Sequence, residues 1–144
     1  MDDQQLLRYS RQIMLPRFDI AGQEKLIASR VLVVGVGGLG SPVALYLAAA
    51  GVGHLTLIDD DVVELSNLQR QIAHGTEDIG KPKVESAREA LNQLNPLVQV
   101  ETINRRLDEA QLNQLIARCD LVLDCSDNFA TRLEVNRCCV NNKI

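Results

Sequence analysis

Three glycines in the stretch VLVVGVGGLGSP (31–42) follow the spacing G-x-G-x-x-G, at Gly35, Gly37 and Gly40. An apolar run precedes them and a helix-forming run follows, which is the context of a phosphate-binding turn. Such a turn offers backbone N–H groups and the positive end of a helix dipole to a phosphate. The same spacing also fits a strand–helix turn that needs small residues for packing, so other residues must decide between the two.

Asp59 favours the phosphate-binding alternative. It lies 19 residues after Gly40, at the end of a second apolar run. A carboxylate in that place accepts hydrogen bonds from the hydroxyl groups of a ribose. Glycine turn and carboxylate together predict a site for an adenine nucleotide.

Basic and amide side chains favour a triphosphate over a dinucleotide. Asn67, Arg70 and Gln71 follow Asp59, and Lys83 stands at the first turn of a later predicted helix. Arginine binds phosphate oxygens through two parallel hydrogen bonds, and lysine acts as a point charge. Arg70 and Lys83 could each instead be solvated surface charges, but their clustering with the other polar residues favours a site for ATP over one for NAD.

Asp127 and Asn128 follow a fourth apolar run and belong to the same predicted crevice. A carboxylate is a hard oxygen ligand, so Asp127 is the candidate for Mg²⁺ that bridges phosphates. The ordinary alternative is that these two residues cap the next helix. In the acidic run before them in the chain, Asp61 could hold a second metal, whereas we interpret Asp60 and Glu64 as turn residues.

The elements that must position these residues are alternating strands and helices. Strands are predicted at 30–35, 54–59, 98–103 and 120–125, and helices at 41–53, 81–96, 108–118 and from about 128 to the end. This alternation predicts a parallel sheet in a Rossmann-like, doubly wound α/β fold with the strand order 3-2-1-4. The ligand crevice then lies between strands 1 and 4, at their carboxyl ends.

Helix faces and caps follow from spacing. Val84, Ala87, Leu91 and Leu94 share one apolar face of a helix that Pro96 ends. The segment DEAQ starts a further helix with a capping box between Asp108 and Gln111, which turns Leu112, Leu115 and Ile116 inward. Gly51 and Gly53 are predicted to stop the helix at 41–53.

Composition bounds the class of protein. The chain has 144 residues, a hydrophobic content of 46% and a net charge of -4, which is typical of one globular domain. The acidic balance and the absence of tryptophan argue against a nucleic-acid partner. The N-terminus has no signal-peptide pattern and no run is long enough to cross a membrane, so we expect a cytoplasmic location and no membrane partner.

Four cysteines and two histidines have no metal-ligand spacing. The cysteines are Cys119, Cys125, Cys138 and Cys139, none of which forms a C-x-x-C pair. We interpret them as buried small apolar residues, without a disulfide or a zinc site. His54 and His74 have no carboxylate or thiolate close in the sequence, and we interpret both as structural.

Several stretches together resemble a known family. They are RYSRQI, VLVVGVGGLGS, LIDDDVVELSNLQRQ, GKPKVES and DLVLDCSDN, which extend along nearly the whole chain. In this combination they resemble the MoeB/ThiF family, which adenylates ubiquitin-like sulfur-carrier proteins and is related to ubiquitin-activating enzymes. The motifs LSNLQRQ and the DN after strand 4 do not belong to dehydrogenases.

The resemblance implies a reaction. The C-terminal glycine carboxylate of a MoaD-like or ThiS-like sulfur carrier attacks the α-phosphate of ATP, which gives an acyl-adenylate and pyrophosphate. This chemistry serves molybdopterin or thiamine biosynthesis, and the motifs leave open which of the two pathways applies. The family resemblance also implies a homodimer.

Residue roles carry over by position. By this resemblance, Gly38 contacts the nucleotide and Asp59 contacts the ribose. The phosphates are contacted by Asn67, Arg70 and Lys83. Asp127 contacts both Mg²⁺ and the phosphates. Arg11, within RYSRQI, reaches the triphosphate bound by the partner subunit and is counted with Arg70, Lys83 and Asp127 as catalytic. The predicted nucleotide-binding set is Gly35, Gly37, Gly38, Gly40, Asp59, Asp61, Ser66, Asn67, Arg70, Gln71, Lys83, Asp127 and Asn128.

The family has a second half that this chain lacks. That half carries two C-x-x-C pairs for structural Zn²⁺, the remaining strands and much of the carrier-binding surface. We therefore expect residues 1–29 to form an N-terminal helical extension, and residues 30–144 to form the Rossmann-like nucleotide-binding domain at the front of a larger protein. Two alternatives stay open: a truncated, non-catalytic nucleotide-binding dimer module, and an NAD-dependent oxidoreductase.

Overall fold

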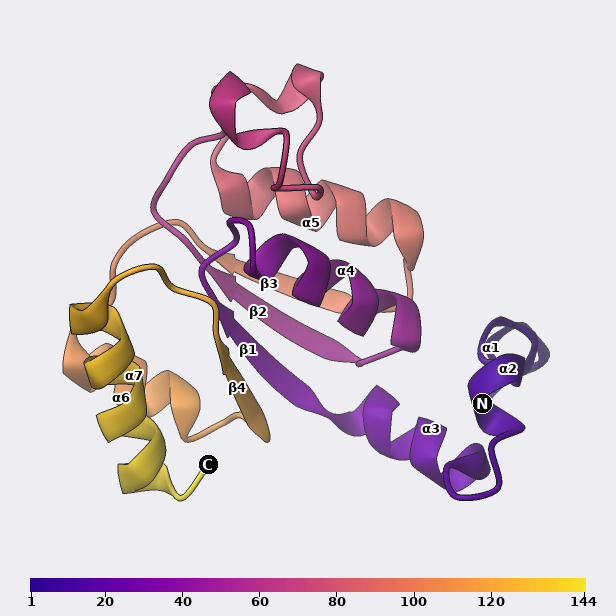
Figure 1. Ribbon diagram of the computed structural model, residues 1–144. Coiled ribbons are helices and arrows are strands. Elements are labelled where there is room, and N and C mark those ends of the chain that lie inside the picture. The colour runs from indigo at the N-terminus through magenta and orange to yellow at the C-terminus, as the bar shows by residue number, and fades with distance from the viewer.

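Four parallel strands form the centre of the computed structural model, which describes residues 1–144 (Figure 1). The strands are β1 (Arg30–Val34), β2 (His54–Ile58), β3 (Gln99–Ile103) and β4 (Leu121–Asp124). Their order is β3-β2-β1-β4, so the predicted doubly wound topology is confirmed. Because every pair is parallel, the carboxyl ends of all four strands lie at one edge of the sheet.

Helices cover both faces of this sheet. One face carries α4 (Gly40–Ala50) and α5 (Lys83–Leu94), and the other carries α6 (Glu109–Ile116) and α7 (Phe129–Asn142) (Figure 1). Two short 3₁₀ helices, η1 (Leu65–Asn67) and η2 (Thr76–Asp78), lie between β2 and α5.

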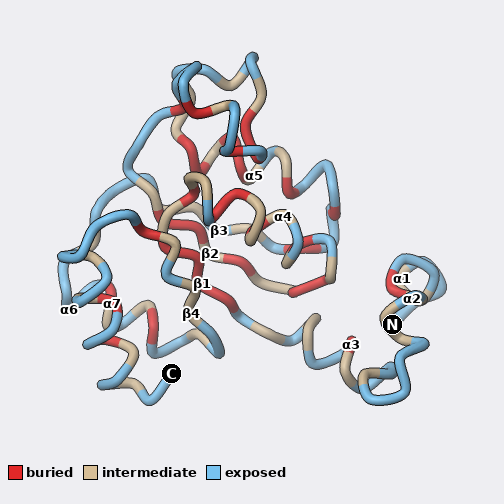
Figure 2. Tube along the Cα trace, viewed as in Figure 1, coloured by how far each residue is buried: buried red, intermediate tan, exposed pale blue.

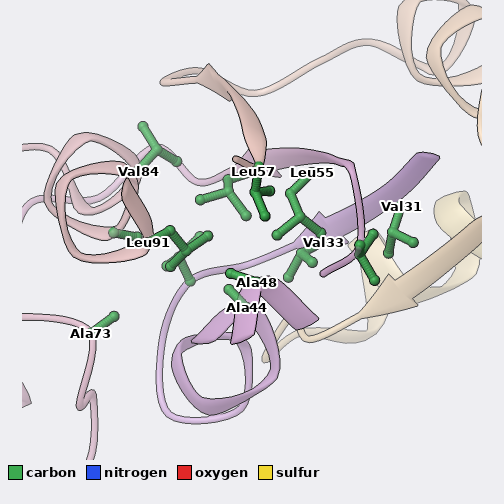
Figure 3. Packing of buried hydrophobic residues seen from close by; sticks show 13 residues of the cluster. Val31, Val33, Ala44, Ala48, Leu55, Leu57, Ala73, Val84 and Leu91 are labelled. Atoms are coloured by element: carbon green, nitrogen blue, oxygen red, sulfur yellow. The ribbon is translucent and has the colours of Figure 1, made fainter. Parts of the chain in front are cut away.

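The central strand β1 explains why the sheet needs two helical layers. Val31 and Val33 pack with Leu55 and Leu57 on the side of α4 and α5 (Figure 3). Leu32 and Val34 belong to the core on the other side, with α6 and α7. Successive side chains of a strand point to opposite faces, so a strand with apolar residues on both faces must be covered twice. Figure 2 shows the resulting burial along β1.

Most predicted caps are present. Gly51 ends α4 in the left-handed conformation, with φ of 88°, and Asp108 and Gln111 form the predicted capping box. Asn95, which precedes Pro96, is extended, as the proline ring requires. Leu94 is the least buried residue of the predicted apolar face, with an exposure of 43%, and it is the last residue of α5.

Three helices form the N-terminal segment: α1 (Asp3–Arg8), α2 (Ser10–Ile13) and α3 (Asp19–Ala28). They are fixed to the carboxyl end of α4. The Nε2 groups of Gln12 and Gln23 both donate to the carbonyl of Ala50, at 2.7 and 3.1 Å. These bonds satisfy a carbonyl that the end of a helix leaves without a partner.

A buried tyrosine adds a second attachment. Asn95 donates from Nδ2 to the Tyr9 hydroxyl at 2.9 Å and to the Ala48 carbonyl at 2.7 Å. Tyr9 and Asn95 are both buried, so the motif RYSRQ holds the N-terminal helices against α4 and α5.

No helix of the chain combines the length and the apolar character that a membrane crossing needs.

The two tyrosines allow a matched test of the N-terminal attachment. Tyr9→Phe leaves one N–H of the buried Asn95 amide without an acceptor and should lower the free energy of unfolding by about 1–2 kcal/mol. Tyr46→Phe is the control, since Tyr46 is 76% exposed and should change it by less than about 0.5 kcal/mol. Urea denaturation measures both, and equal effects would contradict an anchoring role for the Tyr9 hydroxyl.

Candidate nucleotide-binding cleft

A cleft of about 720 Å³ lies at the carboxyl edge of the sheet. Its volume is in the range of sites that hold small ligands. Ten of the predicted site residues line it together: Gly35, Gly37, Gly38, Asp59, Asp61, Arg70, Gln71, Lys83, Asp127 and Asn128. Residues distant in sequence therefore converge where the strand order reverses, between β1 and β4.

Four predicted residues do not line the cleft. Gly40 lies in the glycine turn and is buried. Asn67 is buried in the turn of η1, where its Oδ1 accepts from the Glu64 amide at 3.1 Å, and the carbonyl of Ser66 accepts from Arg70. Arg11 lies on α2, at the other end of α4 (Figure 1).

The glycine turn brings the start of α4 against the end of β1. A Cβ on Gly40 would lie 1.8 Å from the Gly35 carbonyl oxygen, so only glycine permits this approach. The amides of Gly37, Gly38 and Leu39 donate to no acceptor within the chain. Unpaired amides at a helix N-terminus are suited to bind an anion.

Asp59 connects the end of β2 to this turn. Its Oδ2 accepts from the Val36 amide and its Oδ1 accepts from the Asp61 amide, both at 2.8 Å. Each carboxylate oxygen keeps a further lone pair, so the group can also accept a ligand hydroxyl. The sequence predicted a ligand contact for Asp59 but not its second role in fixing the turn.

Lys83 enters the cleft from the first residue of α5 and is nearly buried. Its side chain is 8% exposed, and its Nζ lies 3.2 Å from Oδ2 of Asp61. The Asp61 carbonyl also accepts from the Lys83 amide at 2.9 Å. The Asp61 side chain is 69% exposed, so an incoming anion can replace this carboxylate beside the ammonium group.

Arg70 and Gln71 come from the turn after η1. Arg70 is exposed and crosses over Gly38, and its Nη1 donates to the Ser66 carbonyl at 3.2 Å. Gln71 is 4% exposed, yet its Oε1 has no hydrogen-bond partner. No other buried side-chain oxygen or nitrogen of the chain is in this condition. An unpaired buried amide that borders a cleft indicates a group that a ligand or a bound water completes.

Four aspartates near the cleft differ in how far they are already engaged. The carboxylate oxygens of Asp59, Asp60 and Asp61 lie within 4.8 Å of one another, which resembles a metal-binding group. However, Asp59 already accepts hydrogen bonds from two backbone amides. Asp60 forms an ion pair with Arg106 at 3.1 Å, and Asp61 forms one with Lys83. Asp127 makes no such contact, so among these four aspartates it is the carboxylate free to take a cation.

Asn128 has the ordinary role that the sequence left open. Its side chain accepts from the Thr131 amide at 2.9 Å and caps α7. It also borders the cleft, so capping and ligand contact do not exclude each other.

Three arginines of the cleft were missed by sequence reasoning. Arg105 and Arg106 follow β3, and Arg132 lies on α7. Two basic residues directly after a predicted strand were a signal that could have placed the first pair at the carboxyl edge. Arg132 gave no such signal: its Nε and Nη2 donate to the Ser126 carbonyl at 3.2 and 2.9 Å, a contact that only the fold creates.

The cysteines are free, and burial raises the pKa of each thiol. Only Cys138 is fully buried, while the other three are half-buried, so the prediction of buried cysteines holds for that residue alone. A raised thiol pKa leaves little thiolate at neutral pH, which disfavours a nucleophilic role.

The cleft thus combines unpaired backbone amides, an ammonium group, several guanidinium groups, a carboxylate able to accept a hydroxyl group and a free carboxylate. Amides and cations stabilise phosphate oxygens. The two carboxylates suit a ribose and a divalent metal ion. This combination of groups is suited to bind a nucleotide.

Comparison with known proteins agrees with this chemistry. The ThiF family profile matches residues 9–144. The chain is 55% identical to the molybdopterin-synthase adenylyltransferase of Escherichia coli and 54% identical to the sulfur carrier protein ThiS adenylyltransferase of the same organism. These alignments cover 100% and 97% of this chain, but only 58% and 56% of the relatives. The chain therefore spans a little over half of their length.

Solved structures show the same fold. The tRNA N6-threonylcarbamoyladenosine dehydratase of Escherichia coli, in complex with ATP, superposes with a TM-score of 0.92 at 28% identity, over 99% of this chain and 58% of that one. Escherichia coli MccB with AMPCPP and MccA superposes with a TM-score of 0.81 at 31% identity, over 93% of this chain and 41% of that one.

The same substitution, glutamine to methionine, should change the free energy of unfolding in opposite directions at two buried positions. Gln71→Met removes an unpaired buried oxygen and should raise the free energy of unfolding by about 1 kcal/mol. Gln23→Met should lower it by about 2 kcal/mol, because Gln23 is also buried but bonds to Gln12 and to the Ala50 carbonyl. Chemical denaturation of both variants checks this. A clear loss of stability in Gln71→Met would show that its amide is already satisfied in the free protein.

Proposed function

Because this chain belongs to the ThiF family, we propose that its protein catalyses the ATP-dependent adenylation of the C-terminal glycine of a ubiquitin-like sulfur carrier and releases pyrophosphate. The names of the relatives support this, since they are adenylyltransferases of molybdopterin synthase and of ThiS. The chain spans less than two thirds of those relatives, so the reaction is proposed for the whole protein.

One observation carries the proposal. Free amides of the glycine turn, Lys83 and Arg70 lie around one cleft together with Asp59 and the unengaged Asp127. A dinucleotide needs only the amides and the ribose-binding carboxylate. The added cations and the free carboxylate match a triphosphate with its metal ion, which supports ATP as the nucleotide.

In the proposed reaction a carrier carboxylate oxygen bonds to the α-phosphorus, and the bond from that phosphorus to the bridging oxygen of pyrophosphate breaks. The carrier's own carboxylate is the nucleophile, so no general base is needed. Lys83, Arg70 and the amides of Gly37 and Gly38 would hold the phosphate oxygens in line and stabilise the charge that gathers on the leaving group. Asp59 would fix the ribose at the other end of the nucleotide.

Asp127 would hold Mg²⁺ beside the phosphates. Its hard oxygen donors fit that ion, and unlike Asp59, Asp60 and Asp61 it has no other partner in the chain. When bound, the ion supplies positive charge at the phosphate oxygens. Structural Zn²⁺ and the carrier-binding surface are proposed for the part of the family fold that this chain does not span.

Arg11 is proposed to act across a homodimer. It lies on α2, which is attached to the carboxyl end of α4, whereas the cleft lies at the amino end of that helix. Eleven helical residues span about 16 Å, which is more than one arginine side chain covers. Arg11 is thus badly placed for its own cleft, which supports the proposal that it reaches the cleft of the partner. Arginines supplied in this way stabilise phosphoryl charge in other enzymes.

The two alternatives receive less support. The relatives named above are adenylyltransferases, which does not favour an NAD-dependent oxidoreductase. A non-catalytic module would keep the cleft but not the reaction. A cytoplasmic location is proposed together with the biosynthetic role.

Exchange of labelled pyrophosphate into ATP tests the function. With the full-length protein, Mg-ATP and a purified MoaD-like or ThiS-like carrier, we expect exchange that disappears when the two C-terminal glycines of the carrier are removed. Nucleotide binding without exchange, with every carrier tested, would support the non-catalytic module instead. Thermal stabilisation by NAD but not by Mg-ATP would contradict both.

Mixing two inactive variants tests the role of Arg11. Arg11→Ala and Lys83→Ala subunits should each lack exchange activity, and a refolded equal mixture should recover about one quarter of the wild-type rate. Half of the dimers are then mixed, and each mixed dimer restores one of its two sites. A mixture of Arg70→Ala and Lys83→Ala subunits is the control, since both residues belong to the same cleft and no intact site can form. Recovery in the control, or none in the test mixture, would contradict action in trans.

A further inference from the structure

His74 connects the two walls of the cleft. Its side chain is buried, with an exposure of 6%, in the segment between η1 and η2. Nε2 lies 3.1 Å from the carbonyl oxygen of Val36 in the glycine turn, and Nδ1 lies 2.8 Å from the hydroxyl of Ser86. Ser86 is on α5, three residues after Lys83, and is itself buried. One ring thus joins the glycine turn to the helix that carries the phosphate-binding lysine.

The partners of the ring determine its tautomer. A carbonyl oxygen only accepts hydrogen bonds, so Nε2 must carry the proton. In a neutral imidazole Nδ1 is then an acceptor, and the Ser86 hydroxyl donates to it. Burial lowers the pKa of His74, the hydrogen bond to Val36 raises it, Lys83 lowers it, and the carboxylates of Asp78 and Asp59 raise it. The net direction is downward, in agreement with a neutral ring.

This bond also sets the direction of an amide. In a planar trans peptide the C=O and the following N–H point in opposite directions. With the Val36 carbonyl held toward His74, the Gly37 N–H must point away from the ring, and Gly37 lines the cleft. The Val36 N–H is held by Asp59 at 2.8 Å. Side chains therefore fix both peptide groups of Val36, and the Gly37 amide is left without an acceptor in the chain.

We propose that His74 is a positioning residue for phosphate binding: as the neutral Nε2-protonated tautomer it holds the glycine turn and the Lys83 helix together, so that the Gly37 amide and the Lys83 ammonium group face the same phosphates. This inference rests on the proposed function, because it assigns a role toward the phosphates of ATP. His74 itself does not contact the nucleotide.

Two substitutions of similar size separate the hydrogen bond of His74 to Val36 from the packing of its side chain. His74→Gln keeps an N–H donor that can reach the Val36 carbonyl, whereas His74→Met fills similar space without a donor. In the full-length protein, His74→Met should weaken Mg-ATP binding about tenfold, and His74→Gln should recover most of that loss. Adenosine has no phosphates, so its affinity should change less than threefold in either variant. His54→Gln, at the start of β2 and outside the cleft, is the control.

The tautomer can be measured directly in the unmutated protein. Spectra of 15N-histidine-labelled protein should show a neutral ring protonated at Nε2, assigned by its loss in His74→Gln. The unfolded state binds a proton on this histidine at a higher pH than the folded state does, so its contribution to stability is present above about pH 6.5 and decreases as the pH falls below that value. His74→Gln should remove this part of the pH dependence.

The outcomes distinguish this inference from the proposed function. A protonated ring at neutral pH, or a ring protonated only at Nδ1, overturns the positioning role, and this state is measured in the unmutated protein, with a variant used only to assign the signal. Equal losses for ATP and adenosine, or no rescue by glutamine, overturn it as well. If the unmutated protein binds no ATP, the proposed function fails together with this role, whereas ATP binding that His74→Met leaves unchanged removes only the role of His74.

Discussion

The contact between the Gly35 carbonyl and the α-carbon of Gly40 places the first turn of α4 directly against the end of β1. No other residue type fits there, because a Cβ on Gly40 would meet the carbonyl oxygen at 1.8 Å. The site follows from this constraint. It brings the amides of the turn to the carboxyl edge of the sheet, beside the ends of β2 and β4. A side chain at position 40 would push the start of α4 away from the end of β1. The amides of the turn would then lie farther from the cleft residues that follow β2 and β4.

Two carboxylates and one histidine then hold the glycine turn and Lys83 in place. Asp59 holds the Val36 N–H, His74 holds the Val36 carbonyl, and Asp61 holds Lys83 through both its backbone and its side chain. Apart from the exposed Asp61 side chain, these bonds use groups that are buried or half-buried, so their positions are defined before any ligand arrives. Preorganisation of this kind lowers the reorganisation that binding and catalysis require.

The sequence predicted the parts of this arrangement that depend on local pattern. The four apolar runs became the strands, their order followed from the handedness of crossovers, and ten of the predicted site residues share one cleft. It did not predict contacts that depend on three-dimensional packing. The capping of Ala50 by Gln12 and Gln23, the pairing of Lys83 with Asp61 and the contact of Arg132 with Ser126 join segments whose separation in sequence carries no periodic signal. The exposure of Leu94 has the same origin, since helical spacing does not tell how well the last residue of a helix is covered by the rest of the fold.

The unpaired amide of Gln71 has a consequence for how this position changes over evolutionary time. A buried oxygen without a partner makes the folded state less stable than an apolar side chain of the same shape would. Selection for stability alone would therefore replace glutamine at position 71, and drift would not restore it. A lineage that retains this residue therefore retains a reason for it other than the stability of the unliganded fold, such as a ligand or a bound water that completes the amide.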